Sequence, residues 1–328
     1  MVDDNNPKGI FVEAHYVPAP ATVSPQAQAF LSQRMAAIGP LPPEDLTDKN
    51  GWREYLAMSN QWLLEGMKMG AAAFPAEIIT HERPRSPVYE IVPQTPAPEM
   101  QGAALLYIHG GAYMQGSGLA GAYMAMPLAC VAGVATFAVD YRMPVDHPFP
   151  TGLDDCVDAY RWLLESYEPK KIAIAGGSAG GGLAAALTLK IRDMGLPMPG
   201  AVVLATPESD LTESGDSFET NIHVDVVMTK RLTDSIALYA NGHDLRDPYL
   251  SPFFGDFTKG FPPTFLNCGT RDVFLSNTVL LHRKLRRAGI PAELHVWEGM
   301  PHGGFFGAPE DLEVFEEQAR FIKEQLAG

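Results

Sequence analysis

The sequence is poor in cysteine and in positive charge. Its 328 residues include only three cysteines, and no two of them have the C-x-x-C spacing of a zinc or redox motif. A disulfide framework therefore has little support, and free thiols in a reducing compartment are the simpler interpretation. Lysine and arginine number 24 against 39 acidic residues, and 24 − 39 gives a formal net charge of −15. Because phosphate backbones and anionic lipids repel such a chain, we expect no nucleic-acid partner.

Long hydrophobic runs and targeting segments are missing as well. The most apolar stretch, residues 183–189, is far too short to span a bilayer. Residues 1–7 contain neither the basic start nor the apolar centre of a signal peptide. We therefore expect a cytoplasmic protein without stable membrane insertion. Hydrophobic residues do make up 46% of the chain, which is enough for a substantial core.

From about residue 77 onward, short apolar and β-branched runs alternate with longer amphipathic segments. Several runs are apolar almost throughout, as in strands covered by helices on both faces. The alternation predicts an α/β fold with a mostly parallel sheet, and the short turn at 84–87 predicts an antiparallel start. Thr151, with Asp154 three residues later, is the expected N-cap of one intervening helix. The expected strands are 77–83, 88–92, 103–109, 134–140, 171–175, 201–205, 264–268 and 293–297.

Two segments interrupt this alternation and predict a helical cap. Residues 1–70 contain helical patterns but no strand, and residues 207–245 form a long polar connection. Long insertions on a compact scaffold usually serve as lids or binding loops, so we expect these two segments to pack together. The alternative is that the N-terminal helices only support the sheet. The expected cap helices are 24–37 (with Ser24 as N-cap), 51–69 and 232–239, and the expected catalytic domain covers 71–206 and 246–328.

The strongest local signal is a glycine-rich turn between an apolar run and an Ala/Leu-rich segment. Gly176, Ser178 and Gly180 form the G-x-S-x-G pattern in its strand–turn–helix context. Such a turn exposes the serine hydroxyl and places the backbone N–H of Ala179 at a helix N-terminus, facing developing negative charge. A dinucleotide-binding loop or a P-loop fits less well, because the remaining glycines fall inside the helix and no Gly-Lys-Ser/Thr occurs. We therefore predict Ser178 as a nucleophile.

A second signal, upstream of this turn, supplies hydrogen-bond donors. His109, Gly110 and Gly111 follow an apolar run, and glycine allows the backbone to approach a substrate closely. The N–H groups of Gly110 and Gly111 can then point at an oxyanion. We expect His109 to fix this loop by hydrogen bonding rather than to act as a base.

A serine nucleophile needs a base and an orienting carboxylate. Among nine histidines, His302 lies just past the last expected strand, at the sheet edge where catalytic groups gather, and it is the predicted base. Asp272 follows the preceding strand and gives the chain order Ser, Asp, His. Asp272 is the predicted acid, although an aspartate here also suits a helix N-terminus. Glu208 and Asp210, which follow the strand at 201–205, remain alternatives.

With these motifs, the chain resembles the hormone-sensitive-lipase-like carboxylesterases (bacterial family IV) of the α/β-hydrolase fold. The resemblance runs from about residue 77 to the end and includes Asp-Tyr-Arg at 140–142, His-Pro-Phe-Pro at 147–150 and Asp-Leu-Thr at 210–212. Two positions depart from the family pattern. Its His-Gly-Gly-Gly ends here in Ala112, and its Gly-Asp-Ser-Ala-Gly has Gly177 in place of the aspartate.

The resemblance implies an eight-stranded, mostly parallel sheet flanked by helices, with a cap. It implies no metal or cofactor, and a homodimer is one assembly found in the family. The implied site residues are Ser178 as nucleophile, His302 as base, Asp272 as acid, and Gly110, Gly111 and Ala179 as the oxyanion hole.

The expected reaction is hydrolysis of small to medium apolar carboxylic esters through an acyl-enzyme on Ser178. The partner of such an enzyme is a small-molecule ester. A lactone hydrolase, or an amidase or peptidase, could use the same three side chains. A non-catalytic receptor is a more remote alternative, since the plant gibberellin receptors resemble this family but have lost the histidine that His302 represents.

Overall fold

A computed structural model describes residues 9, 12–33 and 41–327 of the chain. Its centre is an eight-stranded sheet with the strand order β1-β2-β4-β3-β5-β6-β7-β8. β1 pairs antiparallel with β2 and β2 with β4, whereas all other neighbours are parallel. All eight expected strands are present, which confirms the predicted fold class. The strands are β1 (Ala76–His81), β2 (Val88–Pro93), β3 (Ala104–Ile108), β4 (Ala135–Val139), β5 (Ile172–Gly177), β6 (Ala201–Ala205), β7 (Thr264–Gly269) and β8 (Ala292–Trp297).

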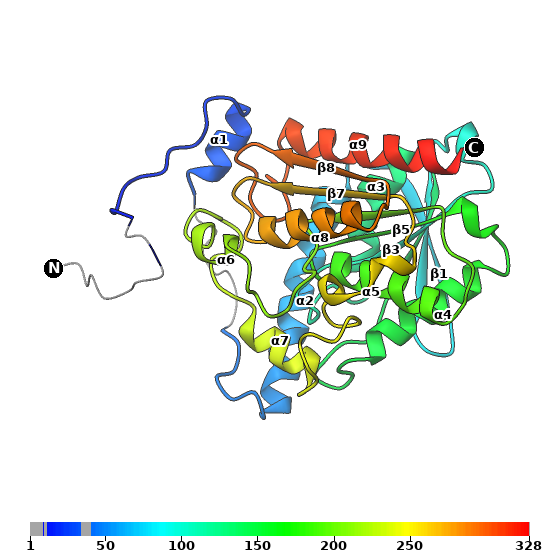
Figure 1. The fold of residues 1–328 in the computed structure, drawn as a ribbon, viewed down its shortest axis with the longest axis horizontal. Coiled ribbons are helices and arrows are strands. Elements are labelled where there is room, and N and C mark those ends of the chain that lie inside the picture. Colours follow the sequence, from blue (N-terminus) through cyan, green and yellow to red (C-terminus); the bar gives the residue numbers. More distant parts are fainter. Residues whose placement is uncertain (1–8, 10–11, 34–40, 328) are drawn as a thin grey trace.

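Helices cover both faces of the sheet (Figure 1). α3 (Leu119–Ala132) and α9 (Pro309–Leu326) pack on one face. α4 (Thr151–Leu163), α5 (Ala179–Asp193) and α8 (Leu275–Arg287) pack on the other. Because side chains alternate along a strand, Leu105 packs with the first layer and Leu106 with the second. Short elements complete the fold: α6 (Ser217–Thr220), η1 (Pro98–Met100), η2 (Pro169–Lys171), η3 (Pro252–Phe254) and η4 (Phe257–Lys259).

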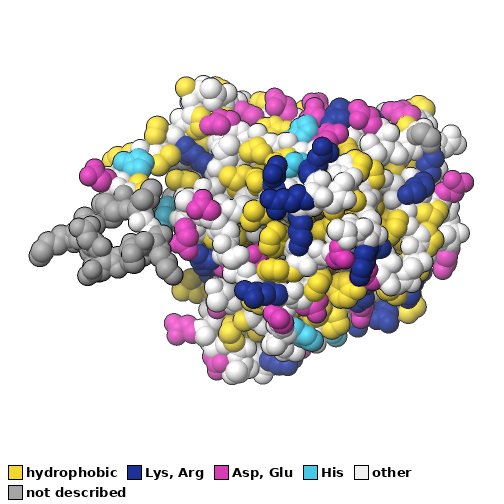
Figure 2. All heavy atoms as spheres, in the orientation of Figure 1, with side chains coloured by type: hydrophobic (Ala, Val, Ile, Leu, Met, Phe, Trp, Pro, Cys, Tyr) yellow, Lys and Arg dark blue, Asp and Glu magenta, His cyan; other side chains and the backbone are white. Residues whose placement is uncertain are grey.

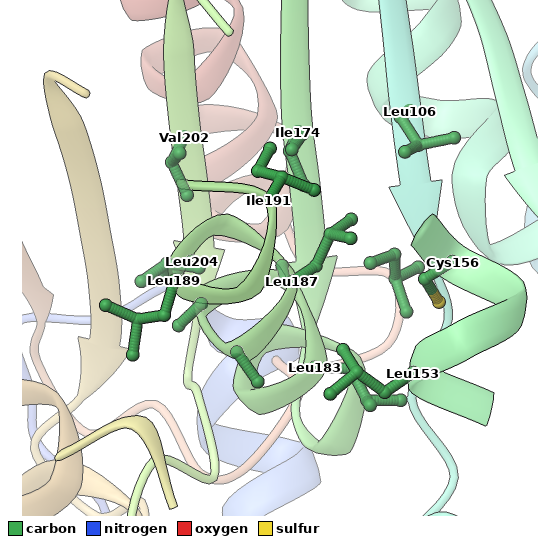
Figure 3. Packing of buried hydrophobic residues seen from close by; sticks show 14 of the residues in the cluster. Leu106, Leu153, Cys156, Ile174, Leu183, Leu187, Leu189, Ile191, Val202 and Leu204 are labelled. Atoms are coloured by element: carbon green, nitrogen blue, oxygen red, sulfur yellow. The ribbon is translucent and has the colours of Figure 1, made fainter. Parts of the chain in front are cut away.

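α5 lies at the centre of the larger core cluster (Figure 3). Leu183 and Leu187 pack with Leu153 and Cys156 of α4 and with Ile174 of β5. The helix is buried on nearly every side, which explains why its sequence is apolar all round rather than striped. Each fully buried leucine contributes about 1.5–3 kcal/mol, so this packing fixes the helix that begins directly after Ser178.

The ends of two helices test the capping predictions. Ser24 caps α1 (Pro25–Leu31) as expected, because its Oγ accepts the Ala27 N–H at 3.2 Å. This helix ends at Leu31, and its predicted continuation to residue 37 runs into residues 34–40, outside the described residues. The predicted N-cap at Thr151 is wrong. The Asp154 N–H bonds to the Pro150 carbonyl at 3.0 Å, so α4 already includes Thr151 and Pro150 is its N-cap.

The N-terminal helices contact both the insertion and the body of the fold. α1 shares an apolar cluster with Val226 of the insertion and with Met300 and Phe305 beyond β8. α2 (Lys49–Ala71) begins in a cluster that reaches α7 (Thr233–Ala240) and ends packed along α3. α2 thus meets the insertion at one end and supports the sheet at the other. The division into a cap and a catalytic domain stays a prediction.

The surface of the described residues carries charge of both signs. Figure 2 shows basic side chains gathered on the face that α8 covers, among acidic groups spread around it. Lys284, Arg286 and Arg287 occupy the last turn of this helix, where positive charge complements the helix dipole. Within the described ranges, no helix is both long and apolar enough to cross a membrane.

Candidate active site

Ser178, Asp272 and His302 come together beyond the carboxyl ends of β5, β7 and β8. His302 Nε2 lies 2.9 Å from Ser178 Oγ. On the other side of the imidazole, Nδ1 lies 3.1 Å from Asp272 Oδ1. Asp272 and His302 are buried, whereas Ser178 is partly exposed. The three side chains that the sequence singled out therefore form one continuous hydrogen-bonded chain.

The local backbone holds Ser178 in a sharp turn. Its φ of 57° and ψ of −127° lie in a region that residues with a side chain rarely adopt. The turn is stabilised because the Ser178 carbonyl accepts N–H groups of Gly181, Gly182 and Glu208. A Cβ on Gly180 would lie 2.1 Å from the Ile108 carbonyl oxygen, so only glycine lets α5 start so close to β3. Strand, turn and helix together present the serine hydroxyl to His302.

Asp272 makes the contacts that both predicted roles require. Oδ1 faces His302 Nδ1 and also accepts the Phe274 N–H at the start of α8. Oδ2 accepts the hydroxyl of Thr206, and that hydroxyl oxygen lies 3.2 Å from His302 Nδ1. The sequence reasoning missed Thr206. Thr206 directly follows a central parallel strand, β6, and a position just after such a strand is also what identified Asp272.

Several charges act on the buried imidazole of His302. Burial by itself lowers its pKa, but the negative charge of Asp272, the hydrogen bond with it, and the charges of Asp225 and Glu208 act in the opposite direction. The net effect raises the pKa of His302 above its ordinary value. The site therefore stabilises the imidazolium that forms when His302 accepts a proton.

The two alternative acids have other surroundings. Glu208 is fully buried, and within the described part of the chain neither of its carboxyl oxygens has a hydrogen-bond partner. Burial raises the pKa of Glu208 to about 8, so the group is mainly neutral at pH 7. Asp210 accepts the Thr212 N–H at 2.9 Å and the Ser214 hydroxyl at 2.8 Å, which fixes its own loop. The geometry favours Asp272 as the partner of His302.

The loop after β3 has the shape of an oxyanion hole. Gly111 has a φ of +115°, which favours glycine, and its carbonyl accepts N–H groups of Met114 and Gln115. Among the backbone bonds of loops, turns and caps in the described residues, none uses the N–H of Gly110, Gly111 or Ala179. These three N–H groups thus lack a partner among those bonds, as the predicted oxyanion hole requires. Ala112, in place of the family's glycine, also has a positive φ, of 54°.

His109 fixes this loop, as the sequence predicted. Its Nδ1 lies 2.8 Å from the Gly110 carbonyl oxygen, and its ring stacks on Tyr141 at 4.2 Å between centroids. The Tyr141 hydroxyl donates to the His109 carbonyl at 3.0 Å. Burial lowers the pKa of His109 to about 4, so the ring stays neutral at physiological pH and acts as a structural element.

Comparisons with known proteins identify the fold and the family. Residues 105–306, well over half of the chain, match a family described by the α/β-hydrolase fold. An acetyl-hydrolase of Streptomyces hygroscopicus is 37% identical over 203 residues, which cover 61% of this chain and 68% of that protein. The crystal structure of an esterase, E25, superposes with a TM-score of 0.88 at 33% identity, covering 97% of this chain and 99% of the other. An esterase of the bacterial hormone-sensitive lipase family superposes with a TM-score of 0.76 at 29% identity, covering 92% and 99% of the two chains.

Proposed function

The chain belongs to the hormone-sensitive-lipase-like carboxylesterases of the α/β-hydrolase fold, and from this premise we propose that Ser178, His302 and Asp272 carry out its ester hydrolysis. The observation that carries the proposal is the hydrogen-bonded chain from Ser178 Oγ through the imidazole of His302 to Asp272. A serine hydroxyl is a weak nucleophile on its own, and a base within 2.9 Å activates it.

The reaction proceeds in two steps through a covalent intermediate. His302 Nε2 takes the hydroxyl proton as Ser178 Oγ bonds to the ester carbonyl carbon, and the electron pair of the carbonyl moves to its oxygen. Backbone N–H groups of Gly110, Gly111 and Ala179 stabilise this oxyanion, each by about 3 kcal/mol. When the carbonyl re-forms, the bond to the alcohol breaks and His302 donates its proton to the leaving oxygen. Water then releases the acid from Ser178 by the same path.

Asp272 acts through His302 rather than on the substrate. It receives the Nδ1–H, which keeps Nε2 free to accept the serine proton, and its charge stabilises the imidazolium. Thr206 holds the second oxygen of Asp272 and so limits its rotation.

Small to medium apolar acyl esters fit the surroundings best. The Phe274 ring stands edge-on to the His302 imidazole with 4.8 Å between centroids, and Val226 and Phe305 belong to the apolar cluster beside it. The similar Streptomyces protein is an acetyl-hydrolase, which supports a short acyl group here. A lactone presents the same carbonyl in a ring, so the same groups would serve it.

Hydrolysis of p-nitrophenyl esters from acetate to palmitate tests this proposal. We expect the rate to peak at short chains and to fall by at least about 10⁴-fold in Ser178→Ala, because the nucleophile is gone. Ser166→Ala, at an exposed serine on the same domain, is the matched control and should keep the wild-type rate. Undiminished hydrolysis by folded Ser178→Ala would refute the assignment.

A further inference from the structure

A buried aspartate outside the triad contacts the backbone of both triad loops. Asp225 lies in the insertion between β6 and α7, at a fully buried position. Its carboxylate accepts four backbone N–H groups, and no part of the proposed reaction uses it. A carboxylate so deeply buried is costly unless it is well hydrogen-bonded, and the four donors offset part of that cost. Burial and the neighbouring Asp272 still raise the pKa of Asp225.

The two carboxylate oxygens of Asp225 accept different pairs of these N–H groups. Oδ1 accepts the N–H groups of Val227 at 2.9 Å and Met228 at 3.0 Å, which fixes the turn of the insertion itself. Oδ2 accepts the N–H of Val273 at 3.2 Å and the N–H of His302 at 3.2 Å. A single oxygen thus joins the backbone of the base to the residue that follows Asp272.

We propose that Asp225 is a positioning residue that holds the loops of Asp272 and His302 at the separation their hydrogen bond requires. The inference rests on the proposed function of Ser178, His302 and Asp272. The loops follow the neighbouring strands β7 and β8, whose pairing ends at Gly269 and Trp297. Backbone bonds from Thr270 to Trp297 and from Arg271 to Met300 then join the first residues of the two loops. The shared oxygen of Asp225 adds a bridge further along the loops, at Val273 and at His302 itself.

Asp225 also acts on His302 through its charge. The charged or titratable groups that face the imidazole are Asp272 from the loop after β7, Asp225 from the insertion and Glu208 from the loop after β6. Glu208 is mainly neutral at pH 7, whereas Asp225 lies close enough for its charge to raise the pKa of His302. Loss of the Asp225 charge should therefore move the acidic limb of kcat/KM, which reports ionisation of the base, to lower pH.

The placement of Asp225 connects the insertion with α1 as well. Val226 and Val227 follow it directly and belong to the apolar cluster with α1, Met300 and Phe305. The side chain of Asp225 therefore connects the contact between α1 and the insertion to the backbone of His302.

The decisive variant is Asp225→Asn, compared with Asp216→Asn as control. Asparagine keeps the size but offers only one acceptor oxygen, so two of the four N–H groups lose their partner. Asp216 is an exposed aspartate of the same insertion whose side chain makes no cap hydrogen bond. Reactive sites are counted by covalent labelling with diethyl p-nitrophenyl phosphate, and kcat per labelled site, KM and the pH profile are measured with p-nitrophenyl acetate.

For Asp225→Asn we expect kcat per labelled site to fall by about 10- to 100-fold, with KM changed by less than about threefold. The acidic limb of the kcat/KM profile should shift to lower pH by about half a unit or more. Asp216→Asn should match the wild type in all three readouts. An unchanged kcat per labelled site together with an unchanged limb would overturn the proposal, even if fewer sites are labelled, because that pattern describes a purely structural residue.

Two further measurements keep the outcome interpretable. Asp225→Glu retains the charge but displaces the oxygens, so it should lower kcat per labelled site without moving the limb. If Asp225→Asn yields no folded protein, this variant decides, and a wild-type kcat per site would overturn the proposal. A wild type that is neither labelled at Ser178 nor active would instead contradict the proposed function on which the inference rests.

Discussion

Oδ1 of Asp272 lies 3.1 Å from Nδ1 of His302 and at the same time accepts the backbone N–H of Phe274 at 2.8 Å. This one oxygen thus contacts both the imidazole and the backbone at the start of α8. The backbone at the start of α8 restrains the carboxylate, and the carboxylate restrains the imidazole of the proposed base. Substitutions at Asp272 should therefore separate a structural effect from a chemical one.

We predict that Asp272→Asn lowers kcat/KM by about 10³- to 10⁴-fold while the thermal unfolding midpoint changes little. The amide oxygen can still accept the Phe274 N–H, so the start of α8 is preserved. The negative charge that stabilises the imidazolium is lost. Steady-state kinetics on p-nitrophenyl acetate and thermal unfolding measure the two effects. Activity within tenfold of the wild type would show that another carboxyl group orients His302.

Glu208→Gln is the matched comparison, because it neutralises the alternative acid without changing its size. Glu208 is already mainly neutral at pH 7, since burial raises its pKa to about 8. We predict that kcat/KM at pH 7 stays within about threefold of the wild type. A loss comparable to that of Asp272→Asn would contradict the assignment of Asp272.

The same variant should change how stability depends on pH. The pKa of Glu208 is higher in the folded than in the unfolded chain, so its contribution is fully present below the unfolded value of 4.5 and is lost as pH rises through about 8. Glu208→Gln removes that loss. The free energy of unfolding of Glu208→Gln should therefore increase relative to that of the wild type between about pH 4.5 and 8, by at most about 1.4 kcal/mol for each pH unit. Urea unfolding of both proteins across this range measures the difference, and a constant difference would contradict the prediction.

Two glycines in the nucleophile turn should respond oppositely to alanine. At Gly177, where the family has aspartate, a Cβ would make only ordinary contacts of 3.8 Å with Ala205. Gly177→Ala should therefore keep activity and stabilise the protein by about 0.4–1 kcal/mol. Gly180→Ala should cost about 3 kcal/mol or more and abolish activity, because its Cβ would meet carbonyl oxygens of β3 and the loop after it. Unfolding and kinetics of the pair test this, and equal behaviour would contradict the described turn.

The docking of α1 should weaken in acid. Glu310 accepts the N–H of Ser24 at 2.6 Å and its hydroxyl at 2.8 Å. Although burial raises the pKa of Glu310, the hydrogen bonds from Ser24 and from the Glu310 backbone outweigh this, and the net pKa is lowered. The stabilisation is thus present above the usual glutamate value and lost as pH falls below it. The protection factor of the Ala27 amide, its intrinsic exchange rate divided by the observed rate, should fall below about pH 4.5 in the wild type. In Glu310→Gln, the protection factor should be lower already at pH 7 and should show no further fall in acid. A retained fall would point to another group.

The strands, and the meeting of Ser178, Asp272 and His302 at one edge of the sheet, could be predicted because both depend on local patterns. Apolar runs between glycine-rich turns define the sheet, and Ser178, Asp272 and His302 each follow a strand whose end lies at the same edge. Thr206 also follows a strand that ends at this edge. A threonine after a strand is common, however, and the sequence does not show that Asp272 lies beside this one.

The contacts of Asp225 could not be predicted from the sequence, for a different reason. It lies in an insertion without periodicity, and its partners Val273 and His302 are 48 and 77 residues away along the chain. Its role depends on tertiary contacts that no short motif encodes. The failed N-cap at Thr151 shows the same limit on a smaller scale, since the Pro150 carbonyl already accepted the bond that defines the first turn.

The contact between Ser24 and Glu310, 286 residues apart, also sets an order of events during synthesis. The ribosome completes α1 on the order of tens of seconds before it makes the residues that α1 packs on. During that interval the apolar side chains of α1 that end up beside Met300 and Phe305 have no final partner. The loop of His302 and the helix that covers it therefore assemble together at a late stage. A nascent chain can expose Ser178 in its finished turn well before it can cleave an ester.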